Sequence, residues 1–143
     1  MIKTFRGLLP DDGQDRIRLS TIKGKVGYRI TKLQVMPEAP FTESEEHILK
    51  IYTIEQSTVD GVVDFSVDTL IAVAAINNHS SGYSDPSIPV ITFDRTIVNQ
   101  DLYLTHVDVQ STKPLNYYIE MEAIDISDAS AEYYTIRDLR SNV

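Results

Sequence analysis

The sequence predicts an all-β protein, a sandwich or barrel of about eight strands that forms one domain over residues 1–143. Three observations predict this fold. Apolar and polar residues alternate over short segments along the whole chain, as they do in half-buried strands. Glycine and proline, six of each, fall almost entirely between these segments. Few segments have the apolar spacing of an amphipathic helix.

The first third of the chain contains three predicted strands. The segment 2–9 ends at the turn "PDDG" (10–13), and basic and apolar residues alternate in the "DRIRLS" that follows. A third strand covers 28–36 and ends at Pro37, because proline has no N–H to offer a sheet. Strict alternation places Arg29, Thr31, Leu33 and Val35 on one face of it and Tyr28, Ile30, Lys32, Gln34 and Met36 on the other.

The middle of the chain continues the pattern. In "HILKIYTIE" (47–55), Leu49 and Ile51 share one face, while Lys50 and Tyr52 share the other. "VDG" (59–61) is a hairpin-type signal, because Asp-Gly suits a positive φ. The apolar segment 65–78 favours a buried strand over a short helix capped by Asp68.

Three more strands are predicted at 90–98, 101–109 and 116–126. The first two are separated by the tight "NQ" (99–100), which would make them a hairpin. The tail, residues 128–140, forms either a short helix or a last strand.

Glu120 and Glu122 invite an acid/base interpretation, because two carboxylates flank the scissile bond in glycoside hydrolases. On a strand, however, they lie two residues apart on one face, opposite Tyr117, Ile119 and Met121. We therefore expect the two glutamates to form the solvent-exposed face of an outer strand.

The composition bears on the class of protein. There is no cysteine, so disulfides, thiolate metal sites and thiol nucleophiles are excluded. A net charge of −8 argues against nucleic acid as a partner. No apolar run approaches the roughly 20 residues of a membrane span, so no membrane partner is expected. The N-terminus lacks the features of a signal peptide, which predicts assembly in the cytoplasm of the cell that makes the protein.

The charges are unevenly distributed along the chain. Residues 1–36 contain eight basic and three acidic residues, whereas 37–143 contain five basic and eighteen acidic residues. This polarity suits head-to-tail contact between copies or docking on an acidic partner. Alternatively, both sets are solvated faces of neighbouring strands within one fold.

Two arrangements of polar residues raise the question of a chemical site. His106, Asp108 and Asp94 would approach one another if 90–98 and 101–109 form a hairpin, and such a set suits a divalent ion. No second histidine lies at ligand spacing, so we predict no metal and no cofactor. The loop 77–89 contains His79, Ser80, Ser81, Tyr83 and Asp85, but it lacks the motif of a serine hydrolase. Its composition is that of a contact loop.

We therefore expect partner contacts rather than catalysis. The candidate contact residues are basic residues of the N-terminal third and aromatic or imidazole side chains elsewhere: Arg16, Arg18, Lys23, Lys25, His79, Tyr83, Tyr133 and Tyr134.

The stretches "ITFDRTIVNQDLYLTH", "NYYIEMEAIDIS" and "YYTIRDLR" resemble small virion structural proteins of tailed bacteriophages, particularly those of marine phages, over about residues 47–140. The resemblance implies a jelly-roll-like antiparallel β-sandwich that decorates the head as an oligomer, with a trimer favoured and the major capsid protein as partner. It carries no catalytic residues to this chain, and the basic N-terminal third has no counterpart in it.

Two other functions stay open at this point. A carbohydrate- or receptor-binding module of a tail or fibre would use His79, Tyr83 and Tyr103. A small hydrolase would use Glu120 and Glu122.

Overall fold

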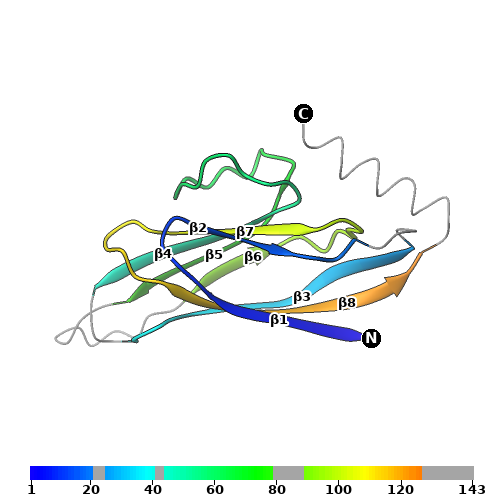
Figure 1. Ribbon diagram of the computed structural model, residues 1–143, viewed down its shortest axis with the longest axis horizontal. Helices are drawn as coiled ribbons and strands as arrows, with labels where there is room; N and C mark the ends of the chain where they lie inside the picture. The colour runs from blue at the N-terminus through cyan, green and yellow to red at the C-terminus, as the bar shows by residue number, and fades with distance from the viewer. Residues whose placement is uncertain (21–24, 41–43, 79–88, 127–143) are drawn as a thin grey trace.

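The computed structural model describes residues 1–20, 25–40, 44–78 and 89–126, and it confirms the all-β prediction (Figure 1). These residues form eight strands in two antiparallel sheets packed face to face. The strands are β1 (Ile2–Leu9), β2 (Gly13–Ile17), β3 (Val26–Pro37), β4 (Glu45–Tyr52), β5 (Leu70–Asn78), β6 (Val90–Phe93), β7 (Leu102–Asp108) and β8 (Leu115–Asp125). Among the described residues, no helix has the length and apolarity to span a membrane.

The strand order is that of a jelly roll with one strand displaced. One sheet has the order β1-β8-β3 and the other β2-β7-β4-β5-β6. An eight-stranded jelly roll would place the sixth strand beside the third. Here β6 pairs with β5 instead, and the chain after it touches β3 at a single bridge between Val98 and Tyr28. The edge of β3 beyond that bridge is therefore left open.

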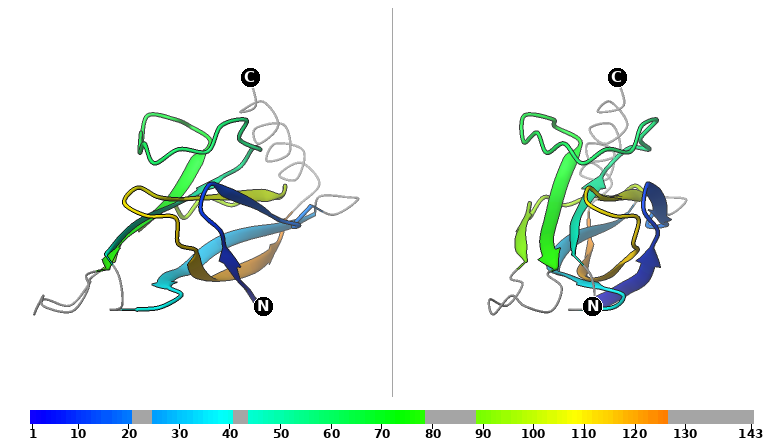
Figure 2. Two further views of the ribbon diagram at one scale, coloured as in Figure 1. Left: turned by 60° about the vertical axis from the view of Figure 1, so that its left-hand side comes forward. Right: turned by 90° about the vertical axis from the view of Figure 1, so that its left-hand side faces the viewer.

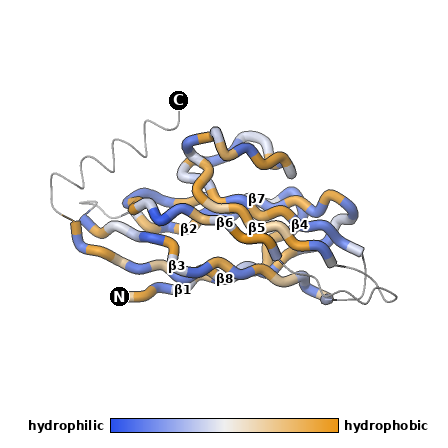
Figure 3. The backbone as a smooth tube through the Cα atoms, turned by 180° about the vertical axis from the view of Figure 1, so that it is seen from behind, coloured by the Kyte–Doolittle hydropathy of each residue, from blue (hydrophilic) through white to orange (hydrophobic). Residues whose placement is uncertain are grey.

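The core lies between the two layers, which Figure 3 shows one above the other. Ile119 and Met121 of β8 face Leu49 of β4 and Leu104 of β7, and all four side chains are fully buried. The residues that alternate with them along each strand point to the opposite face of the sheet, as the period of two requires. The core positions on β8 are those that the sequence predicted.

The predicted faces of β3 are wrong beyond Ile30. The pairing of β3 with β8 shifts by one residue between Ile30 and Lys32, which is a β-bulge at Thr31. The extra residue reverses the alternation, so Ile30 and Leu33 both face the core. Because a bulge changes the register by one position, strict alternation across it assigns every later side chain to the wrong face.

The turn "PDDG" between β1 and β2 is confirmed, with the Gly13 N–H donating to the Pro10 carbonyl over 3.0 Å. The positive φ, 58°, occurs at Asp12. In contrast, Asp60 and Gly61 form no tight hairpin. They belong to a long loop, residues 53–69, that joins the paired strands β4 and β5 and stands above the five-stranded sheet in Figures 1 and 2. The segment 65–78 becomes a strand from Leu70, as favoured.

The segments 90–98 and 101–109 do not form the hairpin considered for them. β6 and β7 are separated in the sheet by β5 and β4. The Asp94 N–H donates to the Ile71 carbonyl at the end of β6, and the chain then crosses to the opposite layer, where Val98 bridges to Tyr28. It returns as β7 on the far side of β4. The tail 128–140 lies outside the described residues.

Candidate functional site

Two basic residues of the N-terminal third, Arg16 and Arg29, form ion pairs with acidic residues of the same fold. β1 and β3 flank β8, and Arg29 on β3 forms an ion pair of 2.5 Å with Glu122. Arg16 on β2 forms a second ion pair with the buried carboxylate of Asp101, at 2.5 Å. For these two pairs, the basic and acidic residues therefore come from neighbouring parts of one fold, which is the alternative to contact between copies.

The candidate contact residues fall into two groups. Arg16 is engaged by Asp101, whereas Arg18 and Lys25 are exposed. The other candidates lie outside the described residues: Lys23, His79, Tyr83, Tyr133 and Tyr134. The remaining polar residues of the 79–88 segment, including Ser80, Ser81 and Asp85, are outside them too.

Glu120 and Glu122 lie on the outward face of β8, as predicted, but β8 is the central strand of its sheet rather than an outer one. Each carboxylate has a partner from the same face. The Tyr118 hydroxyl donates to Glu120 over 2.9 Å, and Arg29 pairs with Glu122. The Tyr118–Glu120 bond is the first cause of the raised pKa of the Tyr118 phenol.

Asp94 does not approach His106 and Asp108, because the hairpin on which that grouping depended does not form. Asp94 is exposed after β6, while His106 and Asp108 face the interior from β7. The structure instead brings a second histidine, His47 of β4, to the same place. We name Glu45, His47, His106 and Asp108 the buried polar cluster; their exposed fractions are 2%, 1%, 0% and 4%.

The pairing of β4 with β7 assembles this cluster. His47 lies opposite Asp108, and Leu49 lies opposite His106. On β4 the inward positions run from Glu45 and His47 to Leu49 and Ile51, so the cluster takes the place of apolar side chains at one end of the core. Extending the alternation back from Leu49 would place His47 on this face. The sequence did not indicate which strand would lie beside it.

Three hydrogen bonds join the cluster in a line. His106 Nδ1 lies 3.0 Å from the Pro10 carbonyl oxygen, His106 Nε2 lies 2.8 Å from His47 Nδ1, and His47 Nε2 lies 3.1 Å from Glu45 Oε1. The two imidazole rings are stacked, with centroids 5.0 Å apart. A carbonyl oxygen can only accept, so His106 Nδ1 carries a proton.

The line needs more positive charge than two neutral imidazoles provide. Each of the three contacts requires one proton, whereas two neutral rings supply two. Burial lowers the pKa of His106 and the neighbouring His47 adds to this effect, against the opposing bond to Pro10. One further proton on the imidazole pair or on Glu45, or a cation between His47 Nε2 and Glu45 Oε1, would complete the line.

Asp108 is held as an anion beside this line. Burial acts to raise its pKa, but backbone N–H groups outweigh burial, and the pKa of Asp108 is lowered. Its Oδ1 accepts from Glu46, Gln110 and Ser111 over 3.1, 3.1 and 3.0 Å, and its Oδ2 accepts from Lys113 over 3.2 Å.

A second feature is the 53–69 loop, which is fixed to the outer face of the five-stranded sheet. The Lys50 ammonium, 3% exposed, donates to the Asp60 carboxylate over 2.8 Å and to the Val62 carbonyl over 2.7 Å. Burial would lower the pKa of Lys50, but the bond to Asp60 and the effect of Tyr52 raise it. A small second core of Tyr52, Leu70 and Val73 lies beneath.

The anchored loop presents apolar side chains to solvent. Val62 and Phe65 are 67% and 68% exposed, and Val63 and Val67 are each 39% exposed. Single exposed apolar residues are ordinary, but four within six positions of one anchored loop make this loop a candidate interaction surface.

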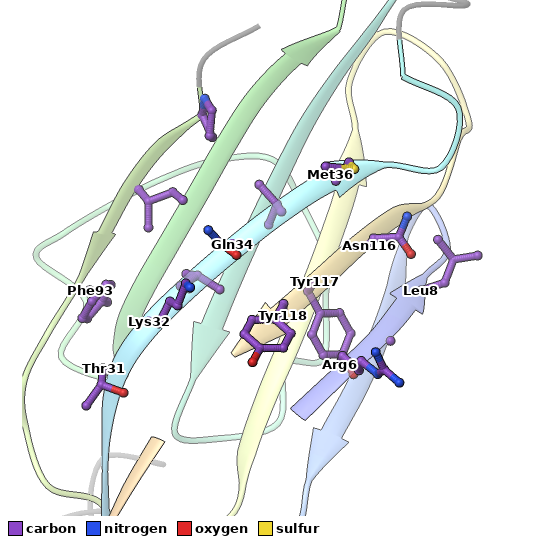
Figure 4. A pocket seen from close by; sticks show the side chains of 15 residues that line it. Arg6, Leu8, Thr31, Lys32, Gln34, Met36, Phe93, Asn116, Tyr117 and Tyr118 are labelled. Atoms are coloured by element: carbon purple, nitrogen blue, oxygen red, sulfur yellow. The ribbon is translucent and has the colours of Figure 1, made fainter. Parts of the chain in front are cut away.

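A third feature is an open groove of about 1020 Å³ that runs along β3, between the outer face of the three-stranded sheet and β6 (Figure 4). It exists because β6 pairs with β5 rather than with β3. Its lining combines aromatic rings, amides, cations and apolar side chains, and includes Arg6, Lys32, Gln34, Met36, Phe93 and Tyr118. The Lys32 ammonium lies 5.9 Å from the centre of the Tyr118 ring.

A scan against protein-family models and a search of curated proteins find no match to this chain.

Proposed function

We propose that this protein is a non-enzymatic structural protein of a tailed-bacteriophage particle, and that it decorates the capsid as a homo-oligomer, with a trimer expected. The proposal has two supports. The sequence resembles small virion proteins over about residues 47–140, and a jelly-roll-like sandwich is the fold that this resemblance implies.

The observation that carries the proposal is the exposed apolar part of the 53–69 loop. We assign it to the contact between copies. Burying the exposed fractions of Val62, Val63, Phe65 and Val67 would contribute roughly 3–6 kcal/mol per copy before the entropic cost of association. Anchoring by Lys50 lowers that cost, because the loop need not be ordered when copies meet.

Light scattering on the purified protein tests the homo-oligomer. The wild type is expected to form a closed oligomer, and Val62→Asp is expected to dissociate it. Val90→Asp is the matched control, because Val90 is 68% exposed on β6, away from the loop. A wild type that stays monomeric at high concentration, or an oligomer that tolerates Val62→Asp, contradicts the assignment.

The neighbouring genes test the assignment to a phage particle. Capsid and portal genes beside this one would agree with it, and genes for sugar-processing enzymes would favour the second function below.

The groove along β3 favours one other function, a carbohydrate- or receptor-binding module. Tyr118 offers a ring with the Gln34 amide beside it, the combination that sugar sites use. Tyr103, predicted for this role, lies instead under the Arg16 guanidinium at 5.9 Å, in a separate polar pocket of about 440 Å³. A glycan array on wild type and Tyr118→Ala tests this function, and the absence of a reproducible hit removes it.

A further inference from the structure

We propose that the buried polar cluster binds one divalent transition-metal ion of the Zn²⁺ class, with Glu45, His47 and Asp108 as its protein ligands. These residues offer one nitrogen and two carboxylate oxygens that all lie within 4.8 Å of one another. Imidazole and carboxylate are accepted ligands of Zn²⁺.

The first argument is the distance between His47 Nε2 and Glu45 Oε1, which lie 3.1 Å apart. An ion with Zn–N and Zn–O bonds of about 2.1 Å would subtend about 95–100° at that separation, an angle that Zn²⁺ accommodates. The two atoms can therefore ligate one ion without moving apart.

The second argument is the support behind the ligands. A zinc-bound histidine usually donates its other ring N–H to a fixed acceptor, which holds the ring in place. Here His106 Nδ1 donates to the Pro10 carbonyl, and with an ion on His47 Nε2 the His47 Nδ1–H would donate to His106 Nε2, 2.8 Å away. Asp108 is fixed by four backbone N–H groups. This arrangement orients both side chains before any ion binds.

The third argument is burial, because a site shielded from solvent lets protein atoms rather than water bind the ion. The exposed fractions of Glu45, His47 and Asp108 are 2%, 1% and 4%.

The ligand set needs a small adjustment to close. Ligand atoms of a tetrahedral Zn²⁺ lie about 3.4 Å apart, given bonds of about 2.1 Å. The separations here are at most 4.8 Å, so side-chain shifts of no more than about an ångström and a half bring the third oxygen into range. Since the ligands are buried, the ion would enter as the chain folds.

Refolding therefore provides the test. The protein is unfolded in urea with a chelator, refolded with Zn²⁺ or with chelator alone, desalted, and analysed for metal content and thermal stability. The wild type is expected to retain one zinc per chain. With free zinc added back at a hundredfold excess over Kd, its Tm is expected to exceed that of the chelated protein by about 5–10 °C.

Two variants and a control make the test specific. Glu45→Gln and His47→Gln are expected to lower zinc affinity at least tenfold. Glu45→Gln preserves the shape of the side chain, so it keeps the test informative if His47→Gln does not fold. His79→Gln, at the third histidine of the chain, is the control and is expected to behave as the wild type. A wild type that retains no zinc, or equal zinc affinity in Glu45→Gln and His79→Gln, overturns the proposal and leaves a proton in the contact.

Discussion

Replacing Lys50 by methionine tests whether one buried ammonium holds the 53–69 loop in place. Methionine keeps the apolar stem but removes the two hydrogen bonds to Asp60 and Val62. Bonds to a charged group are worth about 1.5–3 kcal/mol each, but Asp60 is 52% exposed and is partly solvated when its partner is lost. Methionine also avoids the cost of burying a charge. We therefore expect a net loss of about 1–2 kcal/mol.

Urea denaturation measures this loss, and for a chain of this size it corresponds to a fall in Tm of about 3–6 °C. Lys32→Met, at an exposed lysine, is the matched control and should change stability little. A double-mutant cycle with Asp60→Ala should return a coupling energy of about 0.5–1 kcal/mol. The reasoning is refuted if Lys50→Met is as stable as the wild type, or if its effect is unchanged in the Asp60→Ala background.

Three further predictions concern pH and packing. Burial and then the charge of Asp15 raise the pKa of Tyr117 to about 12. The protonated phenol therefore contributes stability that is complete below about pH 10 and is lost between about pH 10 and 12. Urea titrations of Tyr117→Phe should show a smaller loss of stability over that pH range than the wild type. Burial would raise the pKa of Asp101, but backbone N–H groups and a guanidinium lower it, so stability should fall in acid below about pH 4, and less steeply in Asp101→Asn. Gly27→Ala would place a Cβ 2.5 Å from a methyl of Ile97, and calorimetry should show a loss of about 1–3 kcal/mol.

Much of the fold was predictable from alternation, because each strand has one face toward the core. The faces of β8 and β4 followed from the period of two, as did the outward position of Glu120. Alternation alone does not reveal an inserted residue, so it could not predict the bulge at Thr31. It also does not indicate which strands pair, so it could not show that β6 and β7 lie apart in the sheet.

The buried polar cluster shows the same limit. His47 was assignable to the face that carries Leu49, and His106 to the face that carries Leu104. Their meeting depends on the pairing of β4 with β7, a contact between residues 59 positions apart in the sequence. The contact of Lys50 with the 53–69 loop was not predictable either, since a lysine that alternates with apolar residues is normally assigned to solvent. Here the loop covers it and supplies its partners.

Electron cryo-microscopy of purified phage particles would show whether this protein decorates the capsid. We expect density for the sandwich on the outer capsid surface, as closed oligomers in which Val62 and Phe65 pack against a neighbouring copy. Particles without the protein, or with isolated copies whose 53–69 loop lies in solvent, would rule out the proposed function.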